Sequence, residues 1–143
     1  MRSIHHLVLS VLAGLSVVLV VDAAVDPIVL VGVAIVVGVG IDVDHFPIAR
    51  YNAGSWRALR GCLGDPRRVF LAQDEIFQPG EVWPLQRLLS HVALAGALVV
   101  VVAAGSDTFA LVVTVSLYVH VLADLAWDVA RQDQYFEQVR EST

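Results

Sequence analysis

Apolar residues gather in four long blocks along the chain, and this pattern predicts four membrane-spanning helices. The blocks run over about 7–25, 28–43, 88–105 and 109–127. Each is close to the ~20 residues that a helix needs to cross a bilayer, although the second is shorter. Valine is frequent, but isolated strands cannot satisfy their backbone polar groups in lipid. The predicted fold is therefore an all-α integral membrane bundle of four transmembrane helices, forming a single membrane domain over residues 1–143.

The connections between the blocks differ in length. Asp26-Pro27 marks a tight turn before the second block, because proline suits the first position of a helix. Residues 46–87 form a long loop between the second and third helices. Within it, Ser55 and Asp65-Pro66 are candidate starts of short helices. The chain after Trp127 is charged and predicts a helical extension.

Small residues recur four apart in the first two blocks. Ser10 and Gly14 lie in the first block, and Ala34 and Gly38 lie in the second. At this spacing small residues share a helix face and let a neighbouring helix approach closely. We therefore expect the first two helices to pack against each other along these positions.

The arginines predict the orientation in the membrane. The chain has no lysine, and its basic residues lie in the head, the long loop and the tail: Arg2, Arg50, Arg57, Arg60, Arg67, Arg68, Arg87, Arg131 and Arg140. By the positive-inside rule these three segments and both termini are cytoplasmic, and the two short turns face outward. An alternative interpretation of the first block is a cleaved secretory signal. A retained span is favoured, because the second block follows at once.

Composition narrows the classes of function. The net charge is −5, which argues against a nucleic-acid partner and leaves the lipid bilayer as the expected one. Only 16% of residues are charged, against roughly a quarter in typical soluble domains. The single cysteine, Cys62, excludes an internal disulfide and a cysteine-rich zinc site.

The predicted topology places all five histidines at the cytoplasmic end of the helices. Asp42, Asp44 and His45 follow the second block directly. His120 and Asp124 are four residues apart and share a helix face, which Asp128 continues. The residues expected to meet at this end, as ligands of one metal site, are His6 (or His5), Asp42, Asp44, His45, His91, His120 and Asp124.

Two physical reasons point to a bound cation. Ionisable side chains inside a membrane span are costly and by default mark a functional site. Acids at the C-terminal end of a helix, as we expect for Asp42 and Asp44, oppose the helix macrodipole. Imidazole with carboxylate suits zinc, manganese or iron, and carboxylate alone suits magnesium. The sequence therefore predicts a divalent metal ion as cofactor.

Hydrolysis is the simplest chemistry for such a site. A bound divalent ion lowers the pKa of its water toward ~7, and a neighbouring carboxylate, Asp42, Asp44 or Asp124, takes the proton. Arg87 and Arg50 lie near the same interface and are candidate phosphate ligands, but an anchoring role is favoured for both. An exposed pair with Arg131 is likewise favoured for Asp128. Ser90 and His91 are not expected to act together, because adjacent helix residues point apart.

The order of these residues resembles the membrane-bound metal-dependent hydrolase family of small bacterial and archaeal inner-membrane proteins. The matching residues are His6 (or His5), Asp42, Asp44, His45, His91, His120 and Asp124. The resemblance covers the four spans but not the long loop. The family usually has proline before its Asp-x-Asp-His, where this chain has Gly40-Ile41, and a further histidine upstream of His91, which this chain lacks.

The resemblance implies a membrane-bound hydrolase, and we expect it to act on lipid or other phosphoesters at the interface. Two other classes of function use the same residues. A metal or proton transporter predicts ionisable groups along the whole path through the membrane. The outer halves of the predicted spans carry none, which argues against it. A non-enzymatic scaffold predicts that alanine at Asp42, His45, His120 and Asp124 leaves function intact.

Overall fold

The computed structural model describes residues 3–22 and 24–141, and within them the chain is helical without any strand. The all-α prediction is therefore confirmed. Arg2, one of the arginines behind the topology prediction, lies outside the described residues. The elements are α1 (Ser3–Val20), α2 (Pro27–Gly40), the 3₁₀ turn η1 (Ile41–Asp44), α3 (His45–Ala53), α4 (Arg57–Gly64), α5 (Arg68–Leu71), the 3₁₀ turn η2 (Gln73–Glu75), α6 (Pro84–Ala103), α7 (Asp107–Ala130) and α8 (Gln132–Glu141).

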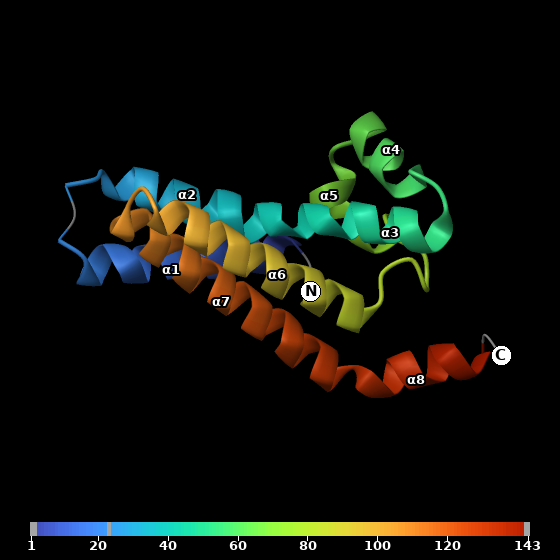
Figure 1. The fold of residues 1–143 in the computed structure, drawn as a ribbon. Coiled ribbons are helices and arrows are strands. Elements are labelled where there is room, and N and C mark those ends of the chain that lie inside the picture. The colour runs from blue at the N-terminus through green and yellow to red at the C-terminus, as the bar shows by residue number, and fades with distance from the viewer. Residues whose placement is uncertain (1–2, 23, 142–143) are drawn as a thin grey trace.

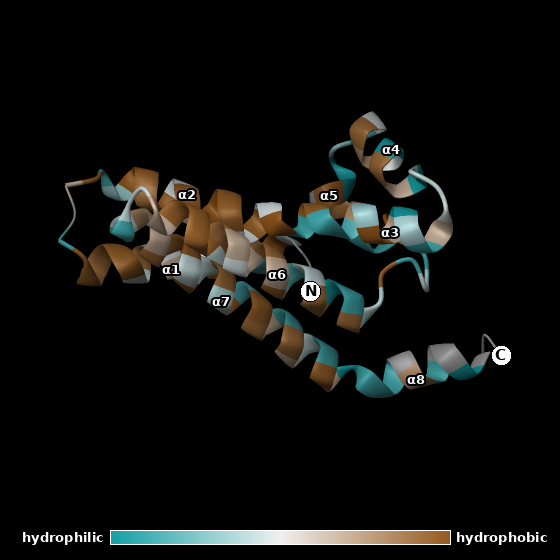
Figure 2. Cartoon of the chain, in the orientation of Figure 1, coloured by the Kyte–Doolittle hydropathy of each residue, from teal (hydrophilic) through white to brown (hydrophobic). Residues whose placement is uncertain are grey.

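Four helical stretches are long and apolar enough to cross a membrane: Ser3–Val20, Pro27–Ala53, Pro84–Ala103 and Asp107–Ala130. They lie side by side, with α1, α2 and α7 in mutual contact and α6 packed on α7 (Figure 1). Most of their length is hydrophobic (Figure 2), and many of their apolar side chains are exposed. Leu19 is 85% exposed, and Val36 and Val100 are each 71% exposed. Such an apolar outer surface suits a lipid environment, so the chain has the features of a membrane protein.

The second apolar helix does not end where the sequence suggested. The helical path continues from α2 through η1 into α3 and stops at Gly54, whose φ of 70° lies in the left-handed region that favours glycine. The expectation that Asp42 and Asp44 close a helix is therefore wrong. They lie within a continuous helical path, with Asp44 at the N-cap position of α3, so the macrodipole gives no reason for a cation here.

The other helix boundaries shift by about one turn. The first, third and fourth long helices each begin earlier than predicted, at Ser3, Pro84 and Asp107. Pro27 opens α2 as expected, and Asp26 caps it, since Oδ1 of Asp26 accepts a hydrogen bond from the Ile28 amide at 2.7 Å. The candidate helix starts at Ser55 and Asp65 are wrong by one or more residues, because α4 begins at Arg57 and α5 at Arg68.

The predicted small residues face one another where α1 crosses α2. A Cβ atom added to Gly14 would lie 2.9 Å from the Cα atom of Val31 and 3.0 Å from the Cβ atom of Ala34. A Cβ atom added to Gly38 would collide with the Ser10 side chain. The expected close approach of the two helices is therefore confirmed, and it brings the histidines of α1 near η1.

Replacing Gly14 by valine should destabilise the protein, whereas Gly32→Val should not. The new side chain at position 14 meets the backbone of α2, and forced overpacking costs about 1–3 kcal/mol. A Cβ atom at Gly32 meets nothing within 4 Å. Thermal unfolding in detergent measures the difference. Equal midpoints for the two variants would contradict the close crossing.

The segment between α3 and α6 is folded rather than extended. Ala58, Cys62 and Ile76 form a small buried core beneath it. Burial raises the pKa of the Cys62 thiol, so this cysteine is a packing residue and a poor nucleophile. Nη2 of Arg57 donates to Oε2 of Glu81 at 2.7 Å, which ties α4 to the chain just before α6. The segment thereby packs beside the end of the helices that carries the histidines.

Candidate metal centre

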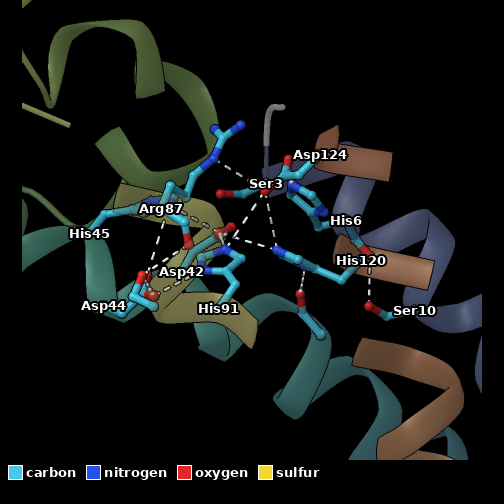
Figure 3. A network of polar contacts seen from close by, with 12 residues as sticks. Ser3, His6, Ser10, Asp42, Asp44, His45, Arg87, His91, His120 and Asp124 are labelled. Carbon is cyan, nitrogen blue, oxygen red and sulfur yellow. Dashed lines mark hydrogen bonds and ion pairs between the residues drawn. The ribbon is translucent and has the colours of Figure 1, made fainter. Parts of the chain in front are cut away.

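Seven predicted site residues meet at one end of the long helices (Figure 3). They come from α1, η1, α3, α6 and α7, and all are buried except Asp42, which is partly buried. The residues are His6, Asp42, Asp44, His45, His91, His120 and Asp124. His5 is not among them, because its ring lies outside, 6.2 Å from that of Trp127. Between the two candidates on α1, the structure therefore places His6 in the cluster.

The first potential ligand group joins α1, η1 and α7. It consists of His6, Asp42, His120 and Asp124, whose ligand atoms lie within 4.8 Å of one another. Nε2 of His6 lies 3.2 Å from Oδ1 of Asp124. Nε2 of His120 lies 3.4 Å from Oδ1 of Asp42 and 3.5 Å from Oδ2 of Asp124. The one-turn spacing of His120 and Asp124 thus has the clamp geometry that their sequence positions predict.

The second potential ligand group joins η1, α3 and α6 and consists of Asp42, His45 and His91. Nε2 of His91 lies 3.3 Å from Oδ1 of Asp42, and Nε2 of His45 lies 3.7 Å from the same atom. Asp42 and His45 share a face because η1 is a 3₁₀ turn, in which residues three apart align. Asp42 therefore belongs to both groups and lies between them.

These separations match the edges of a metal coordination shell. Ligands at about 2.1 Å from one ion lie about 3.4 Å apart in a tetrahedron. The His120 to Asp42, His120 to Asp124 and His91 to Asp42 separations are 3.4, 3.5 and 3.3 Å. They exceed the usual 2.7–3.2 Å of a hydrogen bond. A buried His/Asp group of this kind can bind a metal ion.

Two histidines are oriented from behind by acceptors. Nδ1 of His120 lies 2.6 Å from the carbonyl oxygen of Gly38, and Nδ1 of His91 lies 2.8 Å from Oδ2 of Asp44. A histidine that donates through one ring nitrogen turns the other nitrogen, with its lone pair, toward a ligand position. Asp44 lies outside both ligand groups and contacts the cluster chiefly through His91.

Several buried polar atoms of the cluster have no hydrogen-bond partner among the described residues. Oδ2 of Asp42, Oδ1 of Asp44, and the Nε2 atoms of His45 and His120 are in this state. Leaving a buried polar atom unsatisfied costs about 1–3 kcal/mol each. Metal ions bound by the two groups, with His120 in the first, His45 in the second and Asp42 in both, would satisfy three of the four, so the donor set fits divalent cations.

The charged groups of the cluster also favour a bound divalent cation. The carboxyl groups of Asp42, Asp44, Asp124 and Asp128 lie together, and Arg87 is the one arginine in ion-pair contact with any of them within residues 3–22 and 24–141. Nη2 of Arg87 lies 2.7 Å from each oxygen of Asp128, and its Nε lies 3.6 Å from Oδ2 of Asp124. Asp42 and Asp44 contact histidines rather than this arginine, and carboxylate with imidazole is a donor set that suits a divalent ion.

Two residues near the cluster have other partners than expected. Arg87 is not simply an interfacial anchor, since it bridges α6 to α7, and Asp128 pairs with it rather than with Arg131. Ser90 Oγ also donates to Oδ2 of Asp44, so Ser90 and His91 share an acceptor although they are adjacent on α6. The four-residue spacing of Arg87 and His91 could have indicated that Arg87 lies beside the cluster, since it places both side chains on one helix face.

Comparison with protein-family models, with curated proteins and with solved structures finds no match for this chain. The resemblance to the membrane-bound metal-dependent hydrolases therefore stays a prediction, carried by the spacing of the histidines and aspartates.

Proposed function

We propose that the chain is a membrane-embedded hydrolase whose centre holds two divalent metal ions bridged by Asp42. One observation carries the proposal: two sets of buried ligands from five elements share a single carboxylate. Both groups meet at Oδ1 of Asp42, which lies 3.3 Å from Nε2 of His91 and 3.4 Å from Nε2 of His120, so Asp42 would serve both ions of a two-metal hydrolase. Zinc and manganese suit the mixture of imidazole and carboxylate ligands better than magnesium.

The residues of the cluster have different roles in the proposed reaction. Ions bound here would supply Lewis-acid chemistry, polarising a phosphoryl oxygen and lowering the pKa of a water toward about 7. With Asp42, His6, His120 and Asp124 would hold one ion, and His45 and His91 would hold the other. Asp44 orients His91 through Oδ2, and its Oδ1, which has no hydrogen-bond partner among the described residues, takes the proton from water.

The membrane arrangement is part of the same proposal. The four long helices form a transmembrane bundle, with the metal centre at its cytoplasmic end and residues 54–83 folded over the cytoplasmic face. The arginines support this orientation, because none lies in the two short turns between the helices. The order of the cluster residues supports membership of the membrane-bound metal-dependent hydrolases.

A transporter fits the observations less well. It needs ionisable groups along the path, yet residues 7–20 of α1 and 92–103 of α6 contain no aspartate, glutamate, lysine, arginine or histidine. The ionisable residues gather at one end instead, as a reaction site requires.

Hydrolysis of bis(p-nitrophenyl) phosphate by detergent-purified protein tests the function. We expect turnover with added zinc or manganese, loss of turnover with a chelator, and recovery when metal returns. His120→Ala should lower the rate at least a hundredfold, because it removes a side chain that would bind the metal ion directly. Tyr118→Ala is the matched control on the same helix and should keep the wild-type rate, since Tyr118 is 67% exposed and lies outside the cluster. Equal rates for both variants would refute the proposed centre.

A further inference from the structure

A cavity of about 630 Å³ lies directly beside the metal centre. His45 of the cluster forms part of its wall, together with Arg87, which pairs with Asp124 and Asp128. His45 is also a member of the second ligand group. A molecule that fills the cavity therefore reaches the side chains that we assign to the second ion.

The charge of this cavity favours an anion. Arg131, just after α7, lines it together with Arg87, and Asp74 is the one carboxylate among its described lining residues. The guanidinium carbon of Arg131 lies 4.7 Å from the centre of the Trp127 ring. No ion pair joins Arg131 to a carboxylate of the described residues, whereas Arg87 is held by Asp128. Arg131 is thus the guanidinium available to a phosphate.

An apolar groove of about 310 Å³ continues from the cavity along the outside of α1. Val8 and Leu9 line it, and His5 and Trp127 line both the groove and the cavity. Val8 is 53% exposed, on the apolar outer surface that suits lipid. The polar cavity thus opens into a hydrocarbon-compatible groove, with an amphipathic tryptophan at the boundary.

From this continuity we infer that the substrate is an anionic phospholipid. Its phosphate lies in the cavity between Arg131 and His45, and an acyl chain follows Val8 and Leu9 along α1. Cleavage is hydrolytic: the oxygen of water bonds to phosphorus, the ester P–O bond breaks, and Asp44 passes the proton of water to the leaving oxygen. This substrate class rests on the proposed hydrolase function, whereas binding of the lipid does not require turnover.

Binding is tested without catalysis. The probe is a dioctanoyl phosphonate analogue of phosphatidic acid, which cannot be hydrolysed, measured by native mass spectrometry of the metal-loaded full chain. We expect Arg131→Gln to weaken binding about tenfold, because a charge-assisted contact is lost. Arg50→Gln, an exposed arginine on α3 outside the cavity, should bind like wild type. Equal binding by both variants would overturn the inference.

A rate comparison separates this inference from the proposed function. Val8→Trp fills the groove and should lower hydrolysis of dioctanoyl phosphatidic acid about tenfold more than that of bis(p-nitrophenyl) phosphate, which has no acyl chain. Val100→Trp, on the outer face of α6, is the matched control. Unchanged lipid hydrolysis in Val8→Trp would overturn the lipid substrate but keep the hydrolase. A wild-type protein that binds the phosphonate but cleaves neither ester would instead refute the hydrolase function.

Discussion

Asp42→Ala should empty both metal sites at once and abolish hydrolysis. Asp42 is the residue that the two ligand groups share, and Oδ1 lies 3.3 and 3.4 Å from the Nε2 atoms of His91 and His120. Removing it deprives both ions of a ligand and their common bridge. We expect metal content to fall from two ions per chain to near none after gel filtration. The rate should fall at least about a thousandfold, because each ion supplies several kcal/mol of transition-state stabilisation.

The matched control is Asp22→Ala, which removes an exposed carboxylate between α1 and α2. It should retain two ions and the wild-type rate. His6→Ala provides a second comparison, because His6 belongs to the first group alone. It should lose one ion and keep the other. Loss of only one ion in Asp42→Ala would show that the two groups do not share this carboxylate.

Two substitutions of Asp44 should separate its two roles. Asp44→Ala removes the acceptor of His91 Nδ1, and loss of such a supporting contact lowers metal affinity about 10–100-fold. Asp44→Asn keeps an oxygen that can accept from His91 but cannot take a proton. We expect Asp44→Asn to hold both ions and to lower the rate about 10²–10⁴-fold, the range for loss of a general base.

Metal titration of the purified variants, together with their rates on bis(p-nitrophenyl) phosphate, measures this contrast. The first ion should bind normally in Asp44→Ala, because Asp44 lies outside both groups and contacts the second through His91. If Asp44→Asn hydrolyses the ester as fast as wild type, Asp44 is not the residue that takes the proton from water. If Asp44→Ala binds both ions with wild-type affinity, Asp44 is not needed to orient His91 for metal binding.

The hydropathy pattern was sufficient for the four long helices and their approximate bounds, because each span is a block of apolar residues near the length of a bilayer. The gathering of the histidines also followed from it. Once both short turns lie at one end, His6, His91 and His120 must lie at the other. The pairing of Ser10 and Gly14 with Ala34 and Gly38 came from spacing alone.

What the sequence could not specify depends on how the helices are rotated and where they bend. The path from α2 through η1 to α3 continues past Gly38, Gly40 and Pro47, so these residues do not mark its true end at Gly54. The choice of His6 over His5 depends on the rotation of α1. The pairing of Arg87 with Asp128 depends on how α6 packs on α7, which hydropathy does not determine.

X-ray absorption of the zinc-loaded, detergent-purified protein measures the metal environment directly. Two buried groups of histidines and aspartates predict a shell of nitrogen and oxygen at about 2.0–2.1 Å with imidazole scattering, and a second zinc about 3.5–4 Å away. They also predict no sulfur, because the one cysteine is buried in the separate core with Ala58 and Ile76. A protein that retains no zinc, or a spectrum without imidazole scattering, would contradict a metal centre at this cluster.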